Sequence, residues 1–120
     1  MVELNIQEMC EDLKEWNGVI PIYSNGKDIK DCESQHVLHT KFYKVEFDLK
    51  DDTFIVNWIE IFAHARGKGL GKDLIKTLIN SVREQNLQYF EMATVTSVEN
   101  RRICESLGFH KSGRSYILEL

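Results

Sequence analysis

One stretch of this chain decides how its fold is interpreted: Ile59-Glu60-Ile61-Phe62-Ala63-His64-Ala65-Arg66-Gly67-Lys68-Gly69-Leu70-Gly71-Lys72. It begins in an apolar run typical of a buried strand and ends where an amphipathic helix begins. Three glycines within five residues let the backbone approach a ligand closely, and they expose N–H groups at a helix N-terminus, where the macrodipole favours negative charge. The stretch therefore predicts a phosphate cradle, with added positive charge from Arg66, Lys68 and Lys72.

Two common nucleotide-binding motifs do not fit this stretch. A Walker loop ending at Gly71-Lys72 would need glycine at position 66 and Ser or Thr at position 73, where the chain has Arg66 and Asp73. A dinucleotide-binding fingerprint starting at Gly67 would need its third glycine where Lys72 stands. The pyrophosphate of another cofactor is therefore the ligand that fits best.

The order of Arg66, Gly69 and Gly71 after a strand resembles the acyl-CoA-binding motif Arg-x-x-Gly-x-Gly of the GNAT superfamily of N-acyltransferases. A second segment, Ile103-Cys104-Glu105-Ser106-Leu107-Gly108-Phe109, is similar to that family's Leu-Tyr-Glu-Lys-Leu-Gly-Phe. Two motifs in the right order are more specific than either alone, and the resemblance covers residues 53 to 120. It implies that the loop amides hold the CoA pyrophosphate and that the preceding strand offers backbone groups to the pantetheine arm.

The resemblance implies a cofactor site that spans the strand end, the glycine loop and the first helical turn: Ile61, Phe62, Ala63, Arg66, Gly67, Lys68, Gly69, Leu70, Gly71 and Lys72. It also implies that backbone around Ile61 to Ala63 donates to the thioester oxygen as charge develops there. The implied cosubstrate is acetyl-CoA, and the acceptor is a small-molecule or protein amine. The implied activity is N-acetyl transfer by direct attack of a primary amine in a ternary complex.

Glu60 and Glu91 are the candidates for the general base, because each is a carboxylate inside an apolar strand. Desolvation in such a strand would raise the pKa of a carboxyl group toward neutrality. The alternative is that either carboxylate reaches solvent or pairs with a cation. Several members of the family carry a glutamate in the strand that corresponds to that of Glu91, but the sequence alone does not separate the two candidates.

Cys104 stands where the family's second motif usually has a tyrosine, its frequent general acid. A thiol has a reference pKa of about 8.5 against about 10 for tyrosine, so Cys104 is a candidate to protonate the departing thiolate. The alternative is a cysteine that packs on the core or the cofactor, with water delivering the proton. The missing tyrosine also leaves open a CoA-binding regulatory or interaction module of the same fold without turnover. A phosphate-binding domain unrelated to CoA is a third possibility.

Composition fits one enzyme domain over residues 1–120, with 42% hydrophobic and 28% charged residues. The net charge of -4 argues against a nucleic-acid partner. The apolar runs are too short for a membrane span and no leader is visible, so we expect a cytoplasmic location without membrane contact.

Three cysteines without a Cys-x-x-Cys pair are expected to be reduced. Cys32, His36 and His39 would share a helix face, but no fourth ligand is evident and no metal is expected.

Hydrophobic periodicity predicts helices over Asn5–Trp16, from Leu70 to Glu84 or Gln85, and from a capping box at Thr96–Glu99 to Gly108. It predicts a short strand at Val19–Tyr23, a hairpin of Phe42–Leu49 and Thr53–Phe62, a strand at Tyr89–Val95 and a closing hairpin over Phe109–Leu120. Ser24–Gln35 has no clear pattern. The predicted fold class is α/β (α+β), a mixed central sheet flanked by helices that resembles the GNAT fold with a shortened N-terminal region.

The second strand of the first hairpin is predicted to be buried on both faces in the middle of the sheet. Strict alternation places Ile55, Ile59 and Ile61 on one face of this strand. It places four larger side chains on the other: Phe54, Val56, Trp58 and Phe62.

Overall fold

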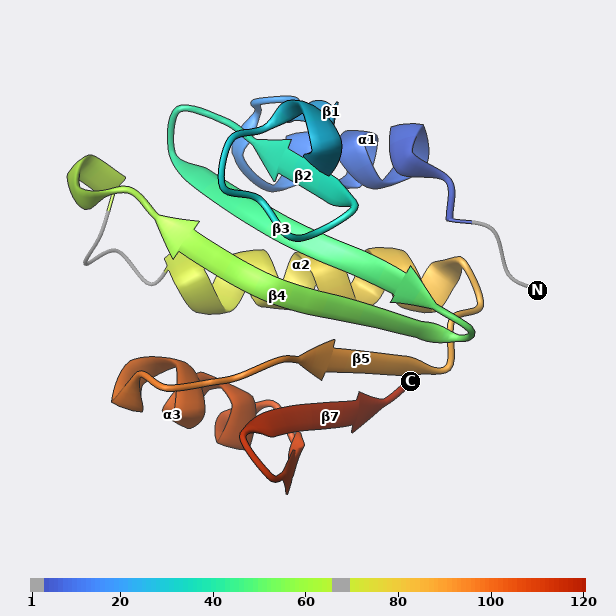
Figure 1. The fold of residues 1–120 in the computed structure, drawn as a ribbon, viewed down its shortest axis with the longest axis vertical. Helices are drawn as coiled ribbons and strands as arrows, with labels where there is room; N and C mark the ends of the chain where they lie inside the picture. The colour runs from blue at the N-terminus through green and yellow to red at the C-terminus, as the bar shows by residue number, and fades with distance from the viewer. Residues whose placement is uncertain (1–3, 66–69) are drawn as a thin grey trace.

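A computed structural model describes residues 4–65 and 70–120, which form a twisted sheet with helices packed behind it (Figure 1). The seven strands lie in the order β1-β2-β3-β4-β5-β7-β6. Neighbouring strands are antiparallel except β4 and β5, which are parallel. This mixed sheet confirms the predicted fold class. The strand bounds are β1 Ile22–Asn25, β2 His36–His39, β3 Tyr43–Lys50, β4 Thr53–Ile61, β5 Tyr89–Met92, β6 His110–Ser112 and β7 Ser115–Glu119.

The α-helices are α1 Ile6–Asn17, α2 Leu70–Glu84 and α3 Val98–Ser106, and two 3-10 turns are η1 Gly26–Asp28 and η2 Ala63–Ala65. Asn5 caps α1 by accepting from the Glu8 N–H at 3.0 Å, and the helix ends at Gly18, which has a left-handed φ of 77°. The predicted capping box makes Thr96 the N-cap of α3. In the structure the N-cap is the next residue, Ser97, whose side chain accepts from the Asn100 N–H. The predicted bounds of α1 and α2 are confirmed to within a residue. None of these described helices is long and apolar enough to cross a membrane.

The helices bury their apolar stripes in one shared hydrophobic cluster against one face of the sheet. Ser81 on α2 donates to Asp12 on α1 at 2.7 Å, which holds these two helices together. Cys104 of α3 joins the same cluster. An aromatic series crosses the strands on this face, with centroid separations of 4.6 Å for Phe47–Phe54, 5.3 Å for Phe54–Phe90 and 5.8 Å for Phe90–Phe109. We call this the core face.

The opposite face of the sheet, here called the open face, carries the even-numbered side chains of β3 together with Asn57, Trp58 and Glu60 of β4. The even-numbered β3 residues are Lys44, Glu46 and Asp48. The alternating burial of β3 separates them from the core-facing Tyr43, Val45 and Phe47.

A β-bulge in β4 contradicts the predicted alternation of that strand. Glu46 pairs with Trp58 and Phe47 pairs with Val56, so Asn57 has no counterpart in the register and the side chains change face there. Phe54 and Val56 therefore point into the core, but so do Ile59 and Ile61. Trp58, predicted to lie beside Phe54 and Val56, is instead 53% exposed on the open face.

Three other local predictions are corrected by backbone geometry. β1 starts at Ile22 rather than Val19, and β5 ends at Met92 rather than Val95, two residues before Thr94 with its left-handed φ of 52°. The segment His36–His39 is a strand, β2, not part of a helix. The parallel β4–β5 pair and the closing β6–β7 hairpin, which turns at Gly113 with a φ of 62°, are confirmed.

Candidate functional site

The parallel pairing of strands β4 and β5 ends halfway along β4. Their parallel register joins Thr53–Val56 to Tyr89–Met92, and the Ala93 N–H adds one more bond to the Val56 carbonyl at 2.9 Å. Beyond this point β4 continues to Ile61, while the chain after β5 turns away toward α3 (Figure 1). An opening between two parallel strands is where α/β folds commonly place a ligand, because backbone groups and loops converge there.

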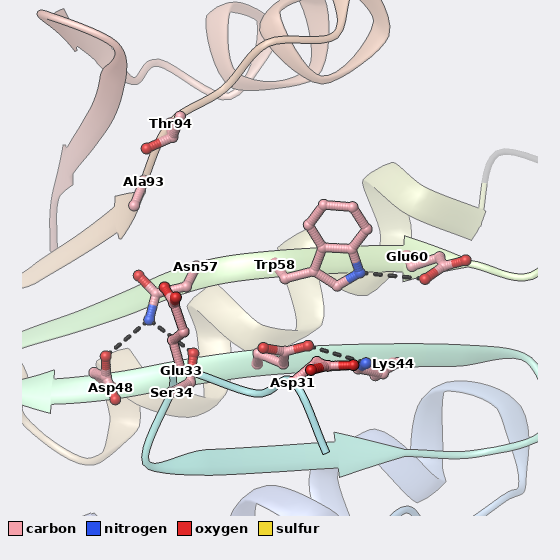
Figure 2. A pocket seen from close by; sticks show the side chains of 11 residues that line it. Asp31, Glu33, Ser34, Lys44, Asp48, Asn57, Trp58, Glu60, Ala93 and Thr94 are labelled. Carbon is pink, nitrogen blue, oxygen red and sulfur yellow. Dashed lines mark hydrogen bonds and ion pairs between the residues drawn. The ribbon is translucent and has the colours of Figure 1, made fainter. Parts of the chain in front are cut away.

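A cavity of about 620 Å³ lies on the open face and spans this opening. Figure 2 shows side chains of β3 and β4 on one side of it and Ala93 and Thr94 on the other. The Trp58 indole N–H donates to Glu60 at 3.2 Å, and Lys44 forms an ion pair with Glu46 at 3.0 Å. The lining residues are Asp31, Glu33, Ser34, Lys44, Glu46, Asp48, Asn57, Trp58, Glu60, Ala93 and Thr94.

The segment that the sequence left undefined supplies one wall of this cavity. The chain from Gly26 to Gln35 folds back over the open face, because the Gly26 N–H donates to the Gln35 carbonyl at 2.9 Å. A Cβ at Gly26 would lie 1.7 Å from the Ser34 carbonyl oxygen, so only glycine fits there. Asn57 at the bulge fixes this loop by donating to Ser34 Oγ at 2.9 Å and to Asp48 at 2.8 Å.

The predicted phosphate cradle is described in part. Arg66, Gly67, Lys68 and Gly69 lie outside the described residues. Leu70 is the first residue of α2, and the first turn of that helix also contains Gly71 and the exposed Lys72. A Cβ on Gly71 would lie 3.8 Å from Ile103 and 3.9 Å from Ile61, so the start of α2 lies between the end of β4 and α3. The first amides of a 15-residue helix point out of its N-terminus and suit an anion at this place.

The backbone predicted to meet the thioester lies at the end of β4 and in the η2 turn. The Phe62 N–H donates to the Phe42 carbonyl at 2.8 Å, so it points toward β3. Successive amides alternate in direction along a strand, which turns the Ile61 N–H toward the side of β5. Ala63 begins the η2 turn and is exposed.

The two candidate bases lie on the same open face but in different surroundings. Glu60 lines the cavity and accepts from Trp58. Glu91 is half-buried between Ile55 and Ile117, its register partners on the neighbouring strands, and is not one of the residues that line the cavity. The geometry therefore places Glu60, rather than Glu91, where a ligand in the cavity would meet it.

Cys104 is fully buried on the core side of α3. Burial, with a smaller contribution from Glu105, raises the pKa of its thiol to about 11. A buried thiol with a raised pKa packs well and transfers protons slowly at neutral pH, which favours the packing role among the alternatives for this residue.

We expect that Cys104→Ala lowers turnover by less than about tenfold, because a true general acid contributes 10²- to 10⁴-fold. The fold should lose stability instead, as a cavity is left in the core. Steady-state kinetics well below the melting temperature, together with thermal unfolding, separates the two effects. A loss of a hundredfold or more at unchanged acetyl-CoA affinity would make the thiol the acid.

Two of the three residues considered for a metal site have other partners. Cys32 donates its thiol to Glu46 at 3.3 Å, and His36 shares a hydrogen bond with the Tyr23 hydroxyl at 2.7 Å. His36 and His39 are three positions apart on a strand, so they face opposite ways. In the described part of the chain no group of three or more His, Cys, Asp or Glu side chains is arranged to hold a metal ion.

Sequence reasoning missed most of the cavity. Asp31, Glu33 and Ser34 come from a segment without periodicity, and Asp48 resembled an ordinary solvent-facing strand residue. One signal was present in the sequence: Asn57 is an amide in an otherwise apolar run, and polar residues with poor strand propensity often mark bulges.

Comparison with known proteins identifies the fold. No family model and no curated protein matches the sequence. Among solved structures, the ribosomal-protein-S18-alanine N-acetyltransferase from Escherichia coli matches with a TM-score of 0.57 and 15% identity over 92% of this chain and 74% of that chain. A GNAT family acetyltransferase from Elizabethkingia anophelis with acetyl-CoA bound gives 0.57 and 12% over 71% of this chain and 74% of that chain.

The polyamine N-acetyltransferase from Drosophila melanogaster, which forms N-acetylagmatine, gives a TM-score of 0.56 and 14% identity over 71% of this chain and 74% of that chain. The structural similarity establishes the fold. At sequence identities this low, the activity has to be argued from the site itself. The chain has the fold of the GNAT acetyltransferases, as its two motifs predicted.

Proposed function

We propose that this protein transfers the acetyl group of acetyl-CoA to a primary amine. The observation that carries the proposal is a ligand-sized cavity at the opening between β4 and β5 of a GNAT fold, in which the N-terminus of α2 lies near the end of β4 on the core face. The pyrophosphate would lie at the first turn of α2, where amides converge. The acceptor would lie in the cavity on the open face, and the two substrates would meet at the opening.

The residues around Gly71 fit such a cosubstrate. Gly71 lies in the first turn of α2 with Ile61 and Ile103 beside it, so this helix N-terminus is next to the end of β4, where a bound pyrophosphate would meet its amides. The described register between β4 and β5 ends at Val56 and Met92, so the end of β4 lies beside the opening. Acetyl-CoA would supply an activated carbonyl and a good leaving group; the protein's part is to position it, exclude competing water and manage protons.

In the proposed reaction, the amine nitrogen forms a bond to the thioester carbonyl carbon and the carbon–sulfur bond breaks. The amine must be neutral to attack, and Glu60 is the carboxylate placed to take its proton, directly or through a water. We assign stabilisation of the carbonyl oxygen, as negative charge develops, to backbone at the strand end around Ile61 to Ala63. The departing thiolate takes a proton from water, because Cys104 is buried on the core side.

The test is thiol release from acetyl-CoA in the presence of an amine panel, with product masses checked by mass spectrometry. We expect turnover with at least one small-molecule or peptide amine, and a mass increase of one acetyl group on that amine. Tight acetyl-CoA binding with no thiol release for any amine, peptide or cell extract would contradict the proposed enzyme and support a CoA-binding module. Absence of acetyl-CoA binding would contradict both.

A further inference from the structure

The cavity on the open face has a composition unlike a general amine site. Among the described residues, its walls carry five carboxylates and one ammonium group. The ammonium of Lys44 is paired with Glu46, so four carboxylates have no cation partner among the described lining residues: Asp31, Glu33, Asp48 and Glu60. A concave, partly enclosed surface of one sign raises the local concentration of ligands of the opposite sign. The protein as a whole has a net charge of only -4, so the negative charge is concentrated here.

The cavity also offers an aromatic surface to a cation. Trp58 is 53% exposed and stands between Asn57 and Glu60 on β4, with its indole N–H already engaged by Glu60 (Figure 2). Its ring faces are therefore not involved in that bond. A protonated amine over an indole face gains a cation–π contribution in addition to the attraction of the carboxylates. The bulge at Asn57 is what turns this ring out of the core and into the cavity.

The carboxylates are spread along the sheet rather than gathered at one point. Glu60 is the register partner of Lys44, and Asp48 lies four residues further along β3. At about 3.4 Å per strand residue, the two carboxylate ends of the cavity are roughly 14 Å apart. Allowing a hydrogen-bond length at each end leaves a spacing of roughly 8 Å between two ligand nitrogens. This spacing fits an extended aliphatic chain with a nitrogen at each end.

We propose that the cavity is the acceptor site and that it selects a linear aliphatic diamine or polyamine. The attacking primary amine would lie at Glu60, and a second, charged nitrogen would lie toward Asp48 and Glu33. This inference rests on the proposed acetyl transfer and goes beyond it by naming the acceptor class. The volume of about 620 Å³ lies within the usual range for small-molecule sites.

The first arm of the test compares acceptors of equal length and different terminal charge: 1,5-diaminopentane, pentylamine and 5-aminopentanoate, with spermidine as the longer cation. We expect kcat/KM for the diamine to exceed that for pentylamine by at least about thirtyfold, and 5-aminopentanoate to be the poorest acceptor. The diamine advantage should shrink as ionic strength rises, because partly exposed charges are screened.

The second arm uses variants of the loop that forms one wall of the cavity, in which Glu33 lies near Asp48 and Asp31 lies near Lys44 (Figure 2). Glu33→Gln should lower the ratio of diamine to pentylamine kcat/KM by about fivefold, and Asp31→Asn combined with Glu33→Gln by more than tenfold. Both residues are exposed, so their replacement should preserve the fold. Glu84→Gln, an exposed carboxylate at the end of α2 outside the cavity, is the matched control and should leave the ratio unchanged.

Equal kcat/KM for the diamine and pentylamine, or an unchanged ratio in the double variant, would overturn the acceptor assignment while leaving acetyl transfer intact. Faster acetylation of a lysine-rich peptide than of spermidine would overturn it in favour of a protein acceptor. Thiol release with none of these amines, despite acetyl-CoA binding, would overturn the acetyl transfer and the acceptor assignment together.

Discussion

Replacing Glu60 by Gln is expected to lower kcat/KM for the amine acceptor by at least about a hundredfold, with the acetyl-CoA dissociation constant unchanged. Gln keeps the length of the side chain and an oxygen that accepts from the Trp58 indole at the same place, but it does not take up a proton at neutral pH. A positioned general base typically contributes 10²- to 10⁴-fold, which sets the size of the loss. Thiol release under subsaturating amine, with calorimetry for acetyl-CoA, measures both quantities.

Glu91→Gln is the matched control for this prediction. Glu91 lies on the same open face, but its strand neighbours are Ile55 and Ile117 and it is not a cavity-lining residue. We expect its replacement to change kcat/KM by less than about fivefold. A large loss for Glu91→Gln with an active Glu60→Gln would reverse the assignment. If both variants match the wild type, the carboxylates are structural and the amine loses its proton to solvent.

The second large effect is expected at the start of α2, where Gly71→Val should weaken acetyl-CoA binding by at least about a hundredfold. The isopropyl group of valine would crowd the space between Ile61 and Ile103, beside the amides that we assign to the pyrophosphate. Loss of two charge-assisted hydrogen bonds, at about 1.5–3 kcal/mol each, accounts for a change of this size. Calorimetric titration with acetyl-CoA measures the affinity, and circular dichroism checks that the helix content is retained.

Gly71→Ala separates steric blocking from any special need for glycine. A Cβ there would meet Ile61 and Ile103 at 3.9 and 3.8 Å, which is ordinary van der Waals contact, so alanine fits without displacement. We expect the alanine variant to bind acetyl-CoA within about threefold of the wild type. Wild-type affinity in the valine variant would show that the pyrophosphate does not lie at this turn.

The parts of the fold that the sequence predicted are those governed by local rules. α1 and α2 follow from one apolar stripe each, and Asn5 and Gly18 supply the ends of α1. The β3–β4 hairpin follows from two apolar runs around Asp51, which adopts a left-handed φ of 54°. The GNAT resemblance of the glycine loop and the second motif then supplied the topology that periodicity cannot give.

The cavity was not predictable because it depends on contacts between distant segments. The loop from Gly26 to Gln35 has no periodic pattern and is held by bonds to Asp48 and Asn57 that only the folded chain brings together. The face of Trp58 was assigned wrongly because strict alternation assumes an unbroken strand, and the register shift at Asn57 breaks it. The sequence also could not distinguish between Glu60 and Glu91 as candidate bases, because the surroundings of each carboxylate depend on which strands lie beside its own.

The bulge at Asn57 places two consecutive side chains of β4, Asn57 and Trp58, on the open face. Before Asn57 the even-numbered residues of β4 face the helices, and after it the odd-numbered residues do. Deleting Asn57 would restore regular alternation along the strand and leave Ile59, Glu60 and Ile61 on their present faces. The deletion would remove the amide that donates to Ser34 and Asp48, so the loop over the open face would lose its link to β4. Homologous proteins without the bulge are therefore expected to keep the core and to lack this wall of the cavity.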